Sequence, residues 1–191
     1  ENAKKTLYIT DELGEKLSDT GSTQGIFAIC NILDKTELSS KIDNKGKYII
    51  LDSLQDPGNI GTIIRTADAV GISGVILCGC CDVYSPKVIR STMGSIFRIP
   101  VFDGNEISSV LDIFEEKAMS VFAAVIDENA EDLISCDFSN GCAVVIGNEG
   151  KGLSPETIAL CKNKLTIRMK GNVNSLNAAM AAGIIMWEML R

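Results

Sequence analysis

Three separated segments combine apolar residues with polar side chains that have no evident structural task. They cover residues 51–65, 144–154 and 167–183, and each passes from an apolar run into Gly, Asn and Ser. The polar side chains in them suited to orienting reactants or holding an anion are Asn59, Arg65, Glu149, Ser175 and Asn177. Apolar runs that end in such loops are typical of strands leading into functional loops. Because ligands of open α/β sheets bind beyond the carboxyl ends of strands, the three segments predict one composite site.

Taken one at a time, these residues also have ordinary structural interpretations. Arg65 fits an exposed helix arginine, one and a half turns into a helix that we expect to start at Asn59. Asn59 and Ser175 each fit the N-cap of a helix. The glycines of residues 147–152 fit a plain turn, although Glu149 in the middle of that turn is harder to explain in this way.

The glycine-rich segment GNEGKG (147–152) matches neither of two familiar nucleotide-binding patterns. A P-loop would need Gly in place of Val145 and Ser or Thr in place of Gly152. No G-x-G-x-x-G follows a predicted strand, so the dinucleotide fingerprint is missing too. A glycine-rich strand end can still hold the polar edges of a small ligand through backbone N–H and C=O groups.

The elements that would position these segments alternate between strands and helices. Apolar runs predict strands over residues 48–54, 74–79, 98–102, 120–126, 142–147 and 164–169. Helical spacing and cap residues predict helices over 60–70, 86–94, 105–118 and 175–190, with Asn105 capping the third, and a further helix opening at Ser154. This alternation predicts an α/β fold with a mostly parallel sheet covered by helices on both faces.

Composition limits the classes of function. The 191 residues contain no His, which excludes Ser-His and Cys-His hydrolases and His-zinc peptidases. The seven cysteines are odd in number, lie mostly in apolar runs and lack a second pair at zinc-ligand spacing, so we expect reduced thiols, no metal and a cytoplasmic location. No apolar run is long enough to span a membrane, and no signal peptide is visible.

The net charge of −7 is unfavourable for binding nucleic acid, but the charges are unevenly distributed. Residues 83–102 and 157–187 contain no acid; their basic residues are Lys87, Arg90, Arg98, Lys162, Lys164, Arg168 and Lys170. A locally basic surface can therefore exist on an acidic chain, since phosphates respond to the local potential. Ordinary solvated faces would give the same pattern.

Taken together, the three segments resemble the motifs of the SpoU (TrmH-like) ribose 2′-O-methyltransferases of the SPOUT superfamily. The frame D-P-x-N-x-G-x-x-x-R is matched by Asp56, Pro57, Asn59, Gly61 and Arg65. The frame G-x-E-x-x-G is matched by Gly147, Glu149 and Gly152. The third frame, I-P-M-x-G-x-x-x-S-L-N, is matched by Ile167, Met169, Gly171, Ser175, Leu176 and Asn177. The motifs occur in the family's order, and the resemblance covers about residues 46–191.

The resemblance implies transfer of a methyl group from S-adenosylmethionine to a ribose 2′-hydroxyl of structured RNA, either rRNA or tRNA, with rRNA favoured. It places Arg65 at that hydroxyl, where we interpret it as a cation that binds phosphate and stabilises the developing alkoxide rather than as a base. Ser175 and Asn177 would bind RNA phosphate or position Arg65, and Asn59 and Glu149 would hydrogen-bond to each other or to facing loops. It implies that the cofactor contacts come from the backbone around Gly147, Ile167, Met169 and Leu176.

The family resemblance also implies an α/β knot near the C-terminus and a homodimer. The apolar stripe of the last predicted helix, consisting of Met180, Ile184, Trp187 and Leu190, would serve that interface or a core. We expect two parts: residues 1–45, a remnant of an N-terminal RNA-binding domain with a linker, and residues 46–191, the catalytic domain. Within the first part, residues 5–10 and 25–30 resemble strands. Because the chain begins at Glu1 rather than Met, we expect a longer parent protein.

Two departures from the family pattern and two alternative functions stand beside this interpretation. Arg168 occupies the position of the family's proline, and Asn174 that of a frequent acidic residue, which affects details of cofactor binding. One alternative is a non-catalytic RNA-binding member of the same fold, which the intact motif residues disfavour. The other is a different α/β enzyme that binds a nucleotide through the glycine-rich loop, which the failed nucleotide-binding patterns disfavour.

Overall fold

The computed structural model describes residues 4–18, 23–32 and 38–191. The chain divides into two units, Glu1–Ile32 and Leu33–Arg191. In the first unit, helix α1 (Asp11–Leu17) begins after Thr10, whose hydroxyl accepts a hydrogen bond from the backbone of Leu13. The strands predicted at 5–10 and 25–30 are wrong, because the described residues there have no neighbouring strand to pair with. Side chains that a sheet would bury, such as Tyr8, are fully exposed instead.

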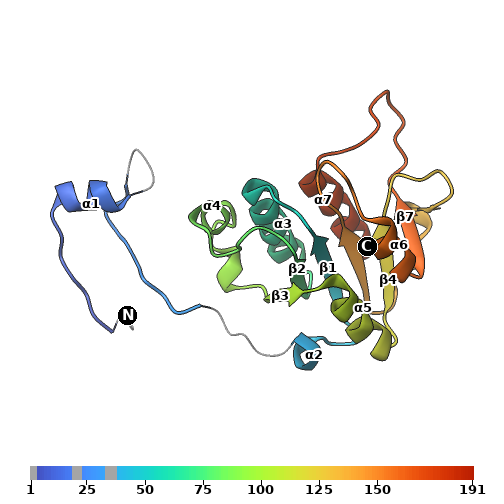
Figure 1. Cartoon of the computed structure of the whole chain (residues 1–191), viewed down its shortest axis with the longest axis horizontal. Coiled ribbons are helices and arrows are strands. Elements are labelled where there is room, and N and C mark those ends of the chain that lie inside the picture. Colours follow the sequence, from blue (N-terminus) through green and yellow to red (C-terminus); the bar gives the residue numbers. More distant parts are fainter. Residues whose placement is uncertain (1–3, 19–22, 33–37) are drawn as a thin grey trace. The chain divides into compact units, whose positions relative to one another are not determined.

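In the second unit, the described strands form one sheet in the order β3-β2-β1-β6-β4-β7-β5 (Figure 1). The strands are β1 (Lys47–Asp52), β2 (Gly74–Cys78), β3 (Val101–Asn105), β4 (Ser120–Ala124), β5 (Glu131–Asp132), β6 (Cys142–Ile146) and β7 (Asn163–Thr166). Every neighbouring pair is parallel. The prediction of a parallel sheet is confirmed, and the knot stays a prediction.

Helices cover both faces of the sheet because successive strand residues point to opposite sides. Ile49 and Leu51 of β1 pack into a core cluster with α3 (Pro57–Val70) and α7 (Ala178–Met189). Tyr48 and Ile50, which alternate with them, pack on the other face against α5 (Ile107–Glu116). The remaining helical elements are α2 (Leu38–Lys41), α4 (Pro86–Ser91), α6 (Pro155–Leu160) and the 3-10 turns η1 (Ser95–Phe97) and η2 (Leu133–Ser135).

The starts of α3 and α7 differ from the predicted ones. Helix α3 begins at Pro57 after the N-cap Asp56, so Asn59 lies inside the helix and is buried rather than being its cap. Helix α7 is capped by Asn177, not by Ser175, because the side-chain oxygen of Asn177 accepts from the backbone of Ala179 and Met180. A cap needs its oxygen within reach of the N2 or N3 backbone N–H, and in α7 Asn177 meets this condition.

Around β3, the structure differs from the predicted strand position and from the predicted helix cap. The strand predicted over 98–102 lies at Val101–Asn105, and η1 occupies the residues before it. Pro100 has no N–H to give to a sheet ladder, which favours a strand that starts after it. Asn105 is the last residue of β3 in a left-handed conformation (φ 53°) and does not cap α5, whose N-cap is Glu106. The short strand β5 and turn η2 were not predicted.

Candidate active site

The carboxyl ends of four neighbouring strands bring the predicted segments together. In the sheet, Leu51 of β1 is paired with Ile146 of β6, and Ala124 of β4 is paired with Leu165 of β7. The loops after these strands contain residues 53–56, 125–130, 147–154 and 167–177, so they leave the sheet at the same edge. The prediction that the three motif segments meet beyond the strand ends is therefore confirmed.

A chain of side-chain hydrogen bonds links one residue from each segment. The side-chain amide of Asn177 donates to the Oδ1 atom of Asn59 at 3.0 Å. The side-chain amide of Asn59 in turn donates to Oε1 of Glu149 at 3.1 Å. This confirms the predicted hydrogen bond between Asn59 and Glu149. Because Asn59 is only 8% exposed and both its amide groups are used, its side chain has a single well-defined orientation.

The carboxylate of Glu149 also holds the loop that precedes α3. Its Oε1 accepts from the backbone N–H of Asp56 at 3.0 Å, and its Oε2 accepts from that of Gln55 at 3.3 Å. Partial burial raises the pKa of Glu149, but hydrogen bonds from its own backbone, Asp56, Asn59 and Gln55 outweigh burial, so the pKa is below its ordinary value. Glu149 is therefore an ionised acceptor that organises the loops around it.

The glycine-rich segment forms a tight turn that is closed by two backbone hydrogen bonds. The N–H of Asn148 donates to the carbonyl of Gly152 at 3.1 Å, and the N–H of Gly152 donates back at 2.8 Å. A Cβ on Gly147 would lie 2.3 Å from the backbone carbon of Gly152, so a side chain there would force the turn open. The Asn148 amide donates to the carbonyl of Ser53 at 2.8 Å, which fixes the turn against the loop after β1.

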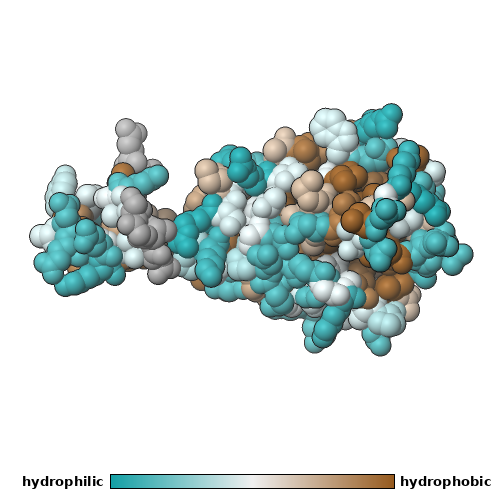
Figure 2. All heavy atoms as spheres, turned by 90° about the horizontal axis from the view of Figure 1, so that it is seen from above, coloured by the Kyte–Doolittle hydropathy of each residue, from teal (hydrophilic) through white to brown (hydrophobic). Residues whose placement is uncertain are grey.

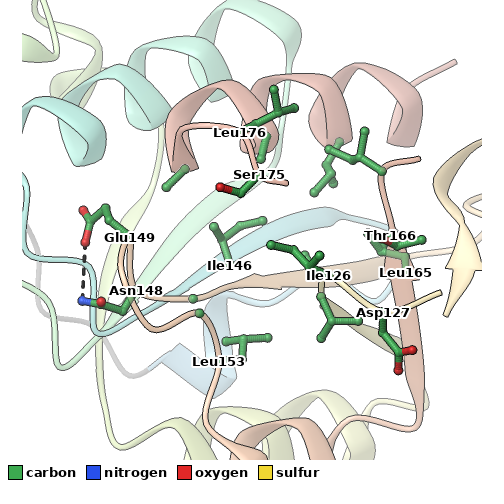
Figure 3. A pocket seen from close by; sticks show the side chains of 18 of the residues that line it. Ile126, Asp127, Ile146, Asn148, Glu149, Leu153, Leu165, Thr166, Ser175 and Leu176 are labelled. Carbon is green, nitrogen blue, oxygen red and sulfur yellow. Dashed lines mark hydrogen bonds between the residues drawn. The ribbon is translucent and has the colours of Figure 1, made fainter. Parts of the chain in front are cut away.

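A cavity of about 570 Å³ lies beside this turn, within the size range of ligand pockets in proteins. Figure 3 shows Ser175 and Leu176 on one side and Leu153 on the other, with Glu149 and Asn148 toward one end and Asp127 toward the opposite end. The cavity is lined by all four residues predicted to contact a cofactor, Gly147, Ile167, Met169 and Leu176. Glu149 and Ser175 line it as well. Its walls combine apolar side chains with exposed loop backbone.

Part of the cavity wall has backbone groups without protein partners. Within the described chain, residues 169–176 make no backbone hydrogen bond, and Met169, Ser175 and Leu176 from this stretch line the cavity. Backbone N–H and C=O groups ordinarily find a partner, so here they are available to a ligand. The apolar walls suit a flat heteroaromatic ring, and the backbone groups suit its polar edge. These features fit the adenosine part of S-adenosylmethionine.

Arg65 does not line the cavity, and neither do Asn59 and Asn177, which are joined by hydrogen bonds to Glu149 in its wall. Arg65 lies on α3 six residues after Asn59, a rise of about 9 Å along the helix axis. Its side chain is exposed and has no hydrogen-bond or ion-pair partner among the described residues. Arg65 thus lies on the molecular surface near the site, not in the wall of the cavity.

Arg168, which departs from the family pattern, connects two loops at the cavity. Its Nη2 atom donates to the carbonyls of Glu128 at 3.2 Å and Ala130 at 3.4 Å. Its Nε atom lies 3.7 Å from Oδ2 of Asp132. The loop that it holds continues from Asp127, which lines the cavity. Where a proline would stiffen the backbone, Arg168 instead connects the two loops through these contacts.

The described cysteines are free thiols, three of them buried and Cys30 exposed. Burial raises the pKa of Cys78 to about 12 and the pKa of Cys142 and Cys161 to about 11, so these thiols remain protonated. No group of metal-ligating side chains occurs among the described residues. In the same part of the chain, no helix has the length and apolar character of a membrane span.

Comparison with known proteins identifies the family. A model of the SpoU rRNA Methylase family matches residues 46–187, most of the chain. The chain belongs to the SpoU rRNA methylase family. The family membership predicted from the three motifs is therefore confirmed.

Two relatives of the chain are named for a methylation site in 23S rRNA, and others are named tRNA/rRNA methyltransferases. The chain is 31% identical over 190 residues to the 23S rRNA (guanosine(2553)-2′-O)-methyltransferase RlmP of Bacillus subtilis, covering 99% of this chain and 74% of the relative. It is 39% identical over 148 residues to the 23S rRNA (uridine(2479)-2′-O)-methyltransferase of Streptomyces viridochromogenes, covering 75% of this chain and 52% of the relative. The chain thus spans about half of that second protein.

The fold is shared with a solved structure that contains the methyl donor. The SpoU methyltransferase AviRb from Streptomyces viridochromogenes, in complex with the cofactor AdoMet, matches with a TM-score of 0.75 and 33% identity. The match covers 82% of this chain and 64% of that one.

Sequence reasoning missed several residues of the site. Asn148 stands within the predicted glycine-rich motif but was treated as a spacer, although an Asn at a strand end before glycines favours a side-chain-stabilised turn. Ile126 and Asp127 line the cavity, and nothing in their local pattern distinguishes them from other residues after a strand. Arg168 was noted only as a departure, and its contacts depend on a loop some 40 residues earlier.

Proposed function

We propose that this chain transfers the methyl group of S-adenosylmethionine to a ribose 2′-hydroxyl in ribosomal RNA. The observation that carries the proposal is the cavity at the strand ends, beside which Asn59, Glu149 and Asn177 are joined by hydrogen bonds. Membership of the SpoU family and the names of the RlmP and AviRb relatives support the reaction and the substrate class.

The cofactor would be held mainly by backbone. The turn at Gly147 and the unpaired backbone at Met169 and Leu176 would bind the polar edge of adenine, and Ile167 would pack against its ring. When bound, S-adenosylmethionine supplies an activated methyl group. The remaining task of the chain is to orient the ribose hydroxyl in line with the methyl group and to stabilise charge that develops on its oxygen. The mechanism that we propose needs no metal ion.

Within the site, the proposed roles divide between substrate contact and positioning. Ser175 lines the cavity with an exposed hydroxyl and would contact the ribose or its phosphate. Arg65 would bind the adjacent phosphate and stabilise the alkoxide, because a guanidinium remains charged at any ordinary pH. Asn59, Glu149 and Asn177 are positioning residues, since they hydrogen-bond to one another.

We propose that the active form is a homodimer through α7. Helix α7 buries one face against the sheet and exposes four large apolar side chains: Met180, Ile184, Trp187 and Leu190. Figure 2 shows hydrophobic residues gathered on one face of the Leu33–Arg191 unit and hydrophilic ones around them. Because α3 packs beside α7 (Figure 1), such a dimer would bring Arg65 of one protomer toward the cavity of the other. This arrangement would explain why Arg65 lies outside the cavity of its own chain.

Further proposals concern the roles of the two parts of the chain and its cellular location. We propose that residues 1–45 contribute to binding the RNA substrate and that residues 46–191 carry catalysis. The reaction on ribosomal RNA and the protonated free thiols favour a cytoplasmic location.

The test uses the full chain, unmodified rRNA made by transcription and a methyl donor labelled on the methyl group. We expect label in 2′-O-methylnucleosides after nuclease digestion, unchanged by a chelator, and calorimetric binding of S-adenosylmethionine but not of ATP. Cofactor binding without methyl transfer to any rRNA would favour the non-catalytic RNA-binding alternative. Binding of ATP without binding of the methyl donor would reject the proposal.

A further inference from the structure

Three basic side chains near the start of the second unit are exposed and unpaired. Among the described residues, Lys87 and Arg90 of α4 and Arg65 of α3 have no hydrogen-bond or ion-pair partner for their charged groups. Of the other basic residues in the acid-free segments, three have partners, whereas Lys164 and Lys170 have none among the described residues. Arg98 pairs with Asp68, Lys162 pairs with Glu115, and Arg168 pairs with Asp132. Unpaired positive charge therefore lies on α3 and α4, and separately at Lys164 of β7 and at Lys170 in the loop after it.

The packing of α3 shows that these three charges belong to one surface. Gly61, Arg65 and Asp68 follow one another at helical spacings of four and three residues and so lie along one stripe of α3. A Cβ on Gly61 would lie 2.2 Å from the Cβ of Ser91, so the end of α4 rests directly on the helix there. At the other end of the stripe, Asp68 is 2.7 Å from the guanidinium of Arg98.

The segment Ser85–Arg98, which contains α4 and η1, thus runs along the stripe with Arg65 between its two contact points. Ser91 lies at one end and Arg98 at the other. Arg65 nevertheless stays exposed, so its guanidinium emerges beside this segment. Figure 1 shows α4 next to α3. The segment that carries Lys87 and Arg90 is therefore the immediate neighbour of the residue proposed to act at the ribose.

The same segment exposes two large apolar side chains. Met93 is 68% exposed and Phe97 is 64% exposed. Met93 has a left-handed backbone (φ 49°), as does Gly94 after it (φ 83°). A left-handed conformation is costly for a residue with a side chain, and such strain concentrates at functional positions. An exposed aromatic ring beside unpaired cations suits an unstacked base next to a phosphate backbone.

We propose that the segment Ser85–Arg98, together with Arg65, is the surface that binds the RNA strand flanking the methylated nucleotide. Lys87 and Arg90 contact phosphates, and the ring of Phe97 stacks on an unstacked neighbouring base. This inference rests on the proposed function and adds the surface that aligns the RNA. The acids nearby leave the net charge positive: Asp68 is paired with Arg98, and the single negative charge of Asp82 offsets only one of the three unpaired basic side chains.

The experiment compares the full chain with the variants Lys87→Ala, Arg90→Ala and Phe97→Ala. Affinity for an unmodified rRNA fragment that the wild type methylates is measured from low to high salt, and binding of S-adenosylmethionine is measured separately. Each lost phosphate contact should reduce the slope of log affinity against log salt by about 0.7. Phe97→Ala should weaken RNA binding roughly tenfold with an unchanged slope, because a stacking contact carries no charge. All three variants should raise KM for RNA and keep the wild-type cofactor affinity.

The matched control is Lys45→Ala, an exposed lysine just before β1 at the opposite edge of the sheet, which should change neither slope nor affinity. Wild-type RNA affinity and salt slope in both Lys87→Ala and Arg90→Ala would overturn the inference. So would a change in oligomeric state without a change in RNA binding, since the surface would then be a protein interface. If the wild type methylates no RNA, the proposed function fails instead, which distinguishes the two.

Discussion

The side-chain amide of Asn177 donates a 3.0 Å hydrogen bond to the side-chain oxygen of Asn59, a residue 118 positions earlier in the chain. The same Asn177 caps α7 through its own oxygen, and the same Asn59 donates to Glu149. One amide pair therefore ties the start of the last helix to the first turns of α3. Since the loop before α7 and Glu149 both line the cavity, the pair links two of its walls through the bond from Asn59 to Glu149.

The first prediction concerns that pair. Asn59→Ala should destabilise the protein by about 1–3 kcal/mol, because it leaves the partners of a buried amide unsatisfied. Asn177→Ala removes the same hydrogen bond and also the N-cap of α7. Losing the cap should lower the free energy of unfolding by about a further 1 kcal/mol. In denaturant unfolding, the double variant should be less destabilised than the sum of the singles. Strict additivity would show that the two amides are not coupled.

Arg65→Ala should lower the single-turnover rate of methyl transfer by a hundredfold to a thousandfold, the usual cost of losing a group that stabilises a developing anion. Binding of S-adenosylmethionine should be unchanged, because Arg65 lies outside the cavity. Arg65→Lys should restore little activity, since an ammonium lacks the planar two-pronged geometry. Wild-type turnover in Arg65→Ala would reduce Arg65 to an ordinary surface arginine.

Glu149 should make part of the stability depend on pH. Its pKa in the folded protein is below the ordinary value of 4.5, so its contribution is present above that value and is lost as the pH falls through the lowered pKa. The melting temperatures of wild type and Glu149→Gln should therefore differ at pH 7 and approach each other as the pH falls through the lowered pKa of Glu149. Both proteins keep the other carboxylates with lowered pKa, such as Asp68 and Glu115, so the difference between their melting temperatures reports on Glu149. A difference between the two melting temperatures that does not change with pH would contradict the prediction.

Arg168→Ala should weaken binding of the methyl donor by roughly tenfold, because two charge-assisted bonds to the carbonyls of the loop beside the cavity are lost. Asp132→Asn should have a smaller effect, since the half-exposed pair at 3.7 Å contributes little. Lys162→Ala, which breaks a surface pair with Glu115, serves as the control. Calorimetry with the methyl donor decides: equal affinity in Arg168→Ala and Lys162→Ala would remove Arg168 from the positioning of the cavity.

Trp187→Glu should convert the proposed dimer into a monomer, because it places a charge among the exposed apolar residues of α7. Sedimentation at micromolar concentration measures the change. The monomer should retain cofactor binding and lose methyl transfer if Arg65 acts across the dimer. A monomeric wild type with full activity would refute both the dimer and that role of Arg65.

The sheet could be predicted from the sequence because its signals are local. Continuous apolar runs such as 142–147 have the length of buried parallel strands, and Pro86 and Pro155 mark helix starts. The errors fell where a local signal was ambiguous. Asn59 and Ser175 are both good cap residues by type, but the caps are Asp56 and Asn177.

The site was predictable where residue types recur in ordered motifs and unpredictable where only packing decides. The bond between Asn59 and Glu149 follows from the motifs, but their spacing gives no sign that Arg65 points away from the cavity. The close packing of Gly61 against Ser91, one turn before Arg65 on α3, is likewise not revealed by any periodicity. The loop held by Arg168 was equally hidden, because its contacts are to backbone carbonyls that any residue could supply.

The distance along the chain between Asn59 and Asn177 also bears on how the protein folds. The hydrogen bonds of Asn59 span 90 and 118 residues, so they belong to the contacts that close late in a folding reaction. During synthesis, β1 and α3 emerge long before the last helix that completes the site. A nascent chain should therefore gain no stabilisation from the methyl donor until α7 has docked. The capacity to bind cofactor should then appear in a single late step rather than by degrees.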